Sequence, residues 1–248
     1  MGTKLRRILI IFIVLIVAFC LAVCFLIYNG VILLNNPSLN EYLVRGVDVS
    51  SYQGEINWYI LSEENISFAF IKATEGSSHQ DKYLKNNLEN ALKTNLSVGA
   101  YHFFSFDSEG VTQAENFISN VPKIKGMLPP VVDVEFYADK EENPPAKEYV
   151  TKELTDILTL LENHYGVKPI IYTTENVYDL YIKEAFVDYD LWIRNVIRKP
   201  NKNITNWKFW QFTNREVLNG YSGDEKYIDV NVFNGAALEF SNYPTVGE

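Results

Sequence analysis

The sequence predicts an α/β fold in which an irregular barrel follows one N-terminal transmembrane helix. Three observations predict it. A long apolar run lies near the N-terminus, eight short apolar strands recur behind it, and the spacing between successive strands shortens toward the C-terminus. The first intervals leave room for helices and the last do not, so the barrel should begin as β/α units and end as strands.

The apolar run covers residues 8–28 and contains no charged residue and no proline. About 20 such residues span the hydrocarbon core of a bilayer as a helix. Basic residues precede the run and the next one is Arg45, so the positive-inside rule keeps the N-terminus in the cytoplasm and exports the rest. The expected segments are a cytoplasmic tail over 1–7, a transmembrane signal-anchor over 8–30, a linker over 31–44, a globular domain over 45–243 and a tail over 244–248.

Two alternatives remain for the apolar run. A cleaved signal peptide has a shorter apolar region and small residues before the cut, and a lipoprotein signal attaches lipid to a cysteine. Phe19 precedes Cys20 and Val23 precedes Cys24, so a bulkier residue stands where either signal needs a small one. We therefore favour a retained anchor in the cell membrane with the domain on the cell-wall side. A cleaved run would make the domain a secreted protein.

The remaining composition limits the partners of the exported domain. The whole chain has a formal net charge of −9. This charge argues against nucleic acid as a partner, because phosphate binding needs clustered Lys and Arg. Cys20 and Cys24 are the only cysteines, so no disulfide and no thiolate metal site are expected outside the membrane. A domain of about 200 residues can be stable through its core alone, and we expect a monomer.

Runs rich in Val, Ile, Phe and Tyr, bounded by Gly, Pro or Asn, are typical of buried strands. The expected strands are 46–49, 68–72, 98–103, 131–135, 170–172, 191–193, 209–212 and 228–232. Intervals of roughly 30 residues or more separate the second to the fifth, enough for a crossover helix. We expect such helices at 83–92 and 147–164, whereas the last three intervals, about 20 residues each, are too short for one.

Two carboxylates lie two residues apart at the end of the fourth strand. Asp133 and Glu135 project to the same face, about 6.6 Å apart along the strand. Like charges so close disfavour joint ionisation, so one pKa should rise, and a carboxyl that stays protonated is the general acid that glycoside hydrolysis needs. Asp-x-Glu is also common by chance, with Asp133 as a turn cap and Glu135 exposed, and spacing alone leaves that open.

Acids also close other strands. Asp48, Glu75 and Asp229 lie at or near strand ends, which carry the chemistry in β/α barrels. Each has a structural alternative as a turn cap, but four strands with such acids predict a cavity lined by carboxylates. A two-metal site could also gather carboxylates. We expect none, because only His102 of the three histidines falls at a strand end.

Aromatic and amide side chains accompany these acids. Sugar rings stack their apolar C–H faces on aromatic rings, and their hydroxyls bond to amides and carboxylates. The residues expected to bind substrate are Glu75, Tyr101, His102, Tyr172, Trp192, Trp210 and Gln211. Among the aromatics we expect Tyr172 and Trp210 to line a groove, and Phe103 and Phe209 to pack in the core.

Together these motifs resemble glycoside hydrolase family 25, the Chalaropsis-type lysozymes, from about residue 45 to 240. The blocks that carry the resemblance, in order, are GVDVSSYQG, FAFIKATEG, GAYHFF, DVE, KPIIYT, LWI, FWQF and DVNVF. The resemblance implies a flattened, irregular TIM-like barrel of five β/α units followed by three strands. It also implies hydrolysis of the β-1,4 bond between N-acetylmuramic acid and N-acetylglucosamine in peptidoglycan strands, without a cofactor.

The resemblance implies a role for each of the four acids. Glu135 matches the family's proton donor. Asp133 matches the neighbour that orients the N-acetyl group of the substrate and stabilises its attack on the anomeric carbon. Asp48 and Asp229 match further acids of the groove, with electrostatic and positioning roles.

Two departures from the family pattern lie near the groove. Ser51-Tyr52 stands where many relatives have His-Trp or Asn-Trp, and Arg194 stands where many have a small residue. The guanidinium of Arg194 could crowd the site or meet an anionic group. We find no C-terminal wall-binding repeats, and an anchor in their place would favour remodelling of the cell's own wall.

Other functions stay open. A carbohydrate-binding or scaffold protein could keep the fold and lose turnover, although it would not need the acid pair. A chitinase-like enzyme typically carries further aspartates before the Asp-x-Glu, where this chain has Pro129 and Val131. A conjugation or secretion apparatus could contain an anchored muramidase, and the sequence does not show whether it does.

Overall fold

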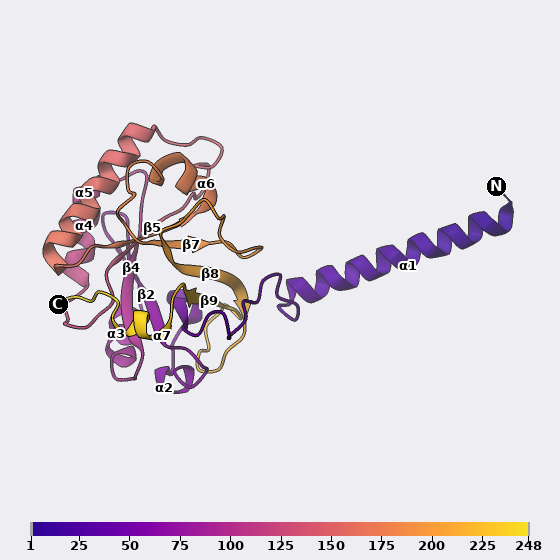
Figure 1. Ribbon diagram of the computed structural model, residues 1–248, viewed down its shortest axis with the longest axis horizontal. Helices are drawn as coiled ribbons and strands as arrows, with labels where there is room; N and C mark the ends of the chain where they lie inside the picture. Colours follow the sequence, from indigo (N-terminus) through magenta and orange to yellow (C-terminus); the bar gives the residue numbers. More distant parts are fainter. Residues whose placement is uncertain (1, 248) are drawn as a thin grey trace. The chain divides into compact units, whose positions relative to one another are not determined.

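The computed structural model describes residues 2–247 and divides the chain into two compact units, Met1–Leu34 and Asn35–Glu248. The first unit is one helix, α1 (Thr3–Tyr28), followed by a short turn (Figure 1). No residue of α1 is buried, and its most apolar window has a mean hydropathy of 3.5. By length and composition, α1 is able to cross a membrane, because a helix that is apolar on all sides needs an apolar surrounding.

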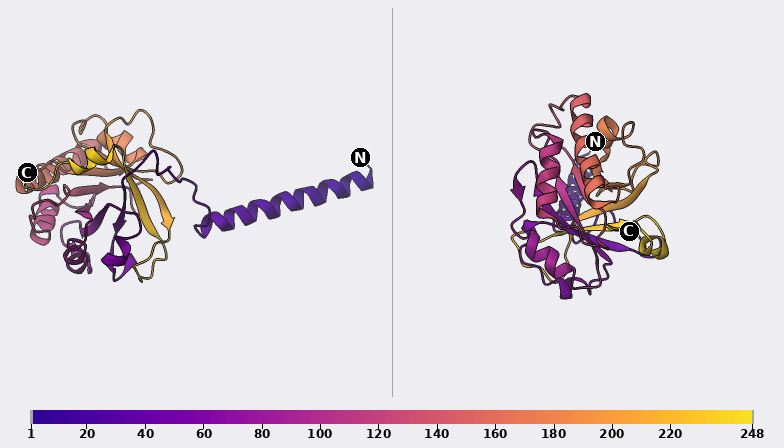
Figure 2. Two further views of the ribbon diagram at one scale, coloured as in Figure 1. Left: turned by 60° about the horizontal axis from the view of Figure 1, so that its bottom comes forward. Right: turned by 90° about the vertical axis from the view of Figure 1, so that its left-hand side faces the viewer.

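The second unit is a closed β/α barrel, as predicted (Figures 1 and 2). Its strands are β1 (Arg45–Val49), β2 (Phe68–Glu75), β4 (Ser97–Phe103), β5 (Val131–Val134), β6 (Ile170–Thr174), β7 (Leu191–Arg194), β8 (Trp207–Glu216) and β9 (Ile228–Phe233). They follow the order β1-β9-β8-β7-β6-β5-β4-β2, and parallel pairing of β1 with β2 closes the ring. The short β3 (His79–Gln80) extends β2.

The last strand gives the barrel its irregularity. Apart from the short β3, the neighbouring strands from β1 through β8 run parallel, whereas β9 runs antiparallel to both β8 and β1. A parallel crossover needs a dozen or more residues, and the short connections before β8 and β9 hold no helix. The predicted sequence of β/α units followed by strands is confirmed.

Helices cover the outside of the barrel. They are α2 (Trp58–Leu61), α3 (Leu84–Ala91), α4 (Gly110–Asn120), α5 (Lys147–Tyr165), α6 (Glu175–Val177) with the π turn Tyr178–Ile182, and α7 (Ala237–Ser241). The helices predicted at 83–92 and 147–164 are α3 and α5. The sequence-based prediction did not include α4, which packs beside α5 (Figure 1). Its buried face contains Gly110, Gln113 and Asn116, so its apolar stripe is incomplete.

The segment before the first strand belongs to the barrel rather than to a free linker. Tyr42 and Val44 are almost fully buried. The ring of Tyr42 packs edge-on against Trp210, 5.8 Å between centroids, and the carbonyl of Val44 accepts from the Phe233 N–H. At the other end Val246 is buried and its carbonyl accepts from Gly126. The packed unit therefore extends beyond 45–243 at both ends.

Strand alternation divides the core into an inner and an outer layer. In β2, Phe68 and Phe70 fill the barrel interior, and Ala69 and Ile71 face the helices. The interior is so full that a Cβ on Gly46 would lie 2.4 Å from the Phe68 ring. Along most strands the inward positions change from apolar to polar toward one end of the barrel, and this end holds the site.

Candidate active site

A cavity of about 360 Å³ opens at the carboxyl end of strands β1 to β8. Its lining residues are Asp48, Ser50, Tyr52, Lys72, Tyr101, Phe103, Asp133, Glu135, Phe136, Tyr172, Trp192, Arg194, Gln211, Asn214 and Asp229. All four predicted catalytic acids lie in this set. Asp229 reaches it from the start of β9, because β9 runs in the opposite direction and pairs Asp229 with Asp48.

Asp48 is the centre of a buried hydrogen-bond network. The Gln211 amide donates to both carboxylate oxygens, at 3.0 and 3.1 Å, and the Asn231 amide donates to Oδ1 at 2.7 Å. Gln211 accepts from the Tyr172 hydroxyl at 3.1 Å, and Asn231 accepts from the Trp192 indole at 2.8 Å. The network therefore fixes two aromatic rings of the cavity wall and holds Asp48 in one orientation.

Burial and mutual repulsion govern the four carboxyls. Burial first and the charge of Glu135 second raise the pKa of Asp133 well above its ordinary value. Burial also raises the pKa of Glu135, against the opposing charges of Arg194 and Lys72. The pKa of Asp229 is raised well above normal by burial and by the neighbouring Asp48. The cluster thus holds protons to a higher pH than separate carboxyls would.

Asp133 carries an unsatisfied acceptor. Its Oδ1 is buried and has no hydrogen-bond partner among residues 2–247. Such an atom in a cavity is ready for a donor that arrives with a ligand, because a buried unpaired acceptor costs free energy. Across the same described residues, no group of three or more His, Cys, Asp or Glu side chains is arranged to hold a metal ion.

Lys72 is a cavity residue that the sequence-based prediction missed. Its Nζ lies 2.7 Å from Glu75 Oε2 and 4.9 Å from the centroid of the Phe103 ring. The alternation from Phe68 and Phe70 would have placed Lys72 on the inward face. Phe103, expected in the core, also lines the cavity, whereas Phe209 is buried in the interior as expected.

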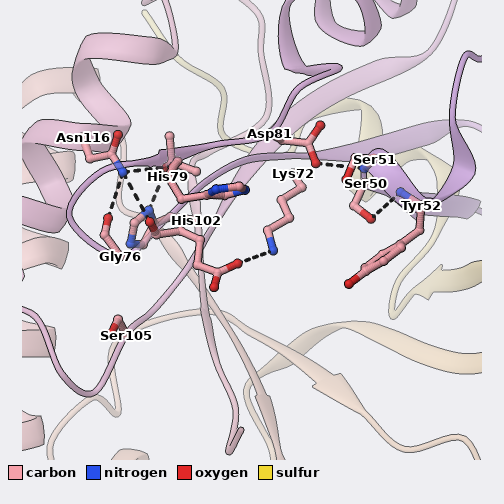
Figure 3. Close-up of polar contacts among 12 residues, drawn as sticks. Ser50, Ser51, Tyr52, Lys72, Gly76, His79, Asp81, His102, Ser105 and Asn116 are labelled. Atoms are coloured by element: carbon pink, nitrogen blue, oxygen red, sulfur yellow. Dashed lines mark hydrogen bonds and ion pairs between the residues drawn. The ribbon is translucent and has the colours of Figure 1, made fainter. Parts of the chain in front are cut away.

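Two turns hold the rim of the cavity, and Figure 3 shows both. The Asn116 amide donates to the carbonyls of Gly76, at 2.8 Å, and His79, at 3.2 Å, and so fixes the turn behind Glu75. Glu75 lies outside the cavity lining and reaches it through Lys72. On the other side Asp81 accepts from the Ser51 N–H at 2.8 Å, which fixes the turn that presents Tyr52.

Three residues of the predicted substrate-binding set do not line the cavity, and this corrects the prediction. Glu75 lies just outside it, and His102 and Trp210 lie on the outer side of the barrel wall. His102 and Trp210 occupy outward positions of their strands, whereas Tyr101 and Gln211, one residue away, point inward. Trp210 packs in the outer core, and its indole donates to the Asn195 carbonyl at 2.9 Å. Adjacent residues of a regular strand point to opposite faces, so His102 and Trp210 cannot share the inward face with Tyr101 and Gln211.

His102 is instead buried, and its ring forms hydrogen bonds to both β2 and α4. Its Nδ1 lies 2.8 Å from Thr74 Oγ1 and its Nε2 lies 3.0 Å from Gln113 Oε1. The Gln113 amide nitrogen donates to the Ser105 and Ser108 carbonyls, so Oε1 is the acceptor and His102 Nε2 carries the proton. Burial lowers the pKa of His102 to about 4, and the ring is neutral at ordinary pH.

The comparison with protein families decides the identity of this barrel. Residues 47–221 match the model described as "Glycosyl hydrolases family 25". The chain belongs to glycoside hydrolase family 25.

Relatives of this family 25 chain agree in fold and sequence. A family 25 glycosyl hydrolase structure from Bacillus anthracis superposes with a TM-score of 0.79 at 58% identity, covering 84% of this chain and 97% of that one. Lysozyme M1 of Streptomyces globisporus is 32% identical over 78% of this chain and 69% of its own length. YegX of Escherichia coli K12 is also 32% identical, over 82% of this chain and 74% of its own length. The chain is accordingly a glycoside hydrolase of the cell-wall-degrading type.

Proposed function

We propose that this family 25 hydrolase is an N-acetylmuramidase that cleaves the β-1,4 bond between N-acetylmuramic acid and N-acetylglucosamine in peptidoglycan. Relatives named lysozyme, autolytic lysozyme and N,O-diacetylmuramidase support this substrate. The observation that carries the proposal is the acid pair. Glu135 has a raised pKa, and Asp133, two residues away, offers an unpaired acceptor to the same cavity.

In this proposal Glu135 protonates the oxygen of the leaving sugar. Asp133 Oδ1 accepts from the acetamido N–H of the muramic acid residue and turns the acetamido oxygen toward the anomeric carbon. That oxygen forms a bond to the anomeric carbon while the glycosidic bond breaks. Water then attacks the same carbon, gives its proton to Glu135 and restores the acetamide. Asp48 and Asp229 stabilise the positive charge that develops on the sugar ring.

Product analysis tests both the bond and the mechanism. The full-length chain in detergent micelles should release peptidoglycan fragments whose new reducing ends are muramic acid, as mass spectrometry would show. Two displacements at one carbon retain configuration, so NMR at early times should detect the β-anomer first. Reducing glucosamine ends would refute the proposed bond, and a first α-anomer would refute acetamido participation.

A cell-wall hydrolase acts outside the cytoplasm, and we further propose that α1 is retained as a signal-anchor. Support comes from its continuous apolar surface and from the basic residues before it. After alkaline carbonate extraction the full-length chain should stay in the membrane pellet, whereas a processed chain would appear in the medium without residues 1–30.

A further inference from the structure

Arg194 stands at the wall between two cavities. It ends β7 and lines the cavity that holds the four acids. A second cavity, of about 410 Å³, lies next to the first and shares with it Glu135, Phe136 and Arg194. A sugar held beside Glu135 in the first cavity therefore has adjoining space into which a substituent of its ring can extend, and Arg194 is at the entrance.

Other polar groups that line the second cavity are already paired with one another. Glu175 accepts from Asn195 Nδ2 at 2.8 Å and from the Arg198 guanidinium at 3.0 Å. The Asn176 amide donates to Glu141 at 2.9 Å. Among the described lining residues of the second cavity, the charge of Arg198 is therefore already balanced by Glu175.

Arg194 differs from these groups. Within residues 2–247 its half-buried guanidinium makes no hydrogen bond and no direct ion pair, although the charges of Glu135, Asp229 and Asp48 act on it across the first cavity. A guanidinium is charged at any ordinary pH and presents planar N–H pairs that match the two oxygens of a carboxylate. Half-buried and with all its N–H donors free of direct bonds, it gains more from an anionic ligand than a fully exposed side chain would.

We propose that Arg194 recognises a carboxylate carried by the muramic acid side of the substrate, with the second cavity receiving the substituent that bears it. This inference rests on the proposed muramidase function. N-acetylmuramic acid differs from N-acetylglucosamine by a lactyl ether on the ring, which ends in a carboxyl group. That carboxyl is either free or linked to a peptide stem with its own carboxylates. Arg194 is thus a specificity-determining residue, separate from the acids that break the bond.

Binding measurements test this independently of turnover. The full-length Glu135→Gln chain would be titrated with a muramic-acid-containing tetrasaccharide, with its lactyl methyl ester and with its peptide-substituted form. In the Glu135→Gln/Arg194→Gln double variant, affinity for a carboxylate-bearing ligand should fall about 10- to 100-fold. Affinity for the neutral ester should be the same in both chains. Arg194→Lys keeps the charge but lacks the planar pair of N–H groups. In the Glu135→Gln chain, this substitution should lower the affinity for carboxylate-bearing ligands by less than Arg194→Gln does.

The pattern of losses also identifies the source of the carboxylate. Loss on the unsubstituted tetrasaccharide assigns it to the lactyl group, and loss on the peptide form alone assigns it to the stem. An equal change in affinity for the ester and for the carboxylate-bearing ligands would overturn the proposal. Arg194 would then act only through the electrostatic effect of its charge on the neighbouring carboxyls. If carboxylate recognition is found but wild type cleaves no glycan, the muramidase assignment fails while the anion site stands.

Discussion

Glu135→Gln should lower the rate of peptidoglycan hydrolysis about 10²- to 10⁴-fold, the range that general acid catalysis contributes. Glutamine keeps the shape and the hydrogen-bonding ability of the side chain but cannot give a proton to the leaving oxygen. The rate would be followed through new reducing ends, with substrate binding and thermal unfolding measured beside it. Binding should persist, because the loss concerns the transition state and not the ground state.

The matched control is Glu115→Gln, which makes the same chemical change at an exposed position on α4 and should leave the rate unchanged. In the wild type, activity should also decline as the pH rises through the raised pKa of Glu135, since the acid form is then lost. An active Glu135→Gln chain would show that another group supplies the proton. A wild-type chain that binds glycan without cleaving it would favour the binding or scaffold function instead.

Asp133→Asn should reduce hydrolysis about 10²- to 10³-fold, in line with the removal of one preorganised electrostatic partner. The same change should raise the melting temperature at pH 7. Burial raises the pKa of Asp133 well above normal, so the folded state resists ionisation of this group and the wild type is less stable where the carboxyl is charged. Asparagine removes that cost.

The sign of the pH dependence provides the check. A carboxyl whose pKa is raised by folding stabilises the folded state below its unfolded pKa, and this stabilisation is lost as pH rises through the folded pKa. The advantage of Asp133→Asn in unfolding experiments should therefore be largest near neutral pH and should shrink on acidification toward pH 4. A variant that is less stable than wild type at pH 7 would show that Asp133 instead holds the fold together as a charged partner.

Both variants concern residues that the sequence pointed out by itself. Apolar runs that end in Asp48, Asp133 and Glu135 predicted the strands, and the rule that barrel chemistry lies at strand ends predicted a common cavity. The same reasoning failed for His102 and Trp210, although the information was present. Counting by twos from Phe209 to Gln211 places Trp210 on the outer face.

The sequence by itself thus determined the strands, their two faces and the residue types at their ends, because these follow from local periodicity. Only the tertiary structure decided which face is inside and which distant residues meet there. Reversal of β9 brings Asp229 beside Asp48, and Gln211 and Asn231 hold that carboxylate. Within residues 2–247 the folded barrel also leaves Asp133 Oδ1 without a hydrogen-bond partner and places Arg194 near Glu135 and Asp48. Pairing, burial and the pKa values that follow from them depend on neighbours distant in the chain, and no local pattern encodes them.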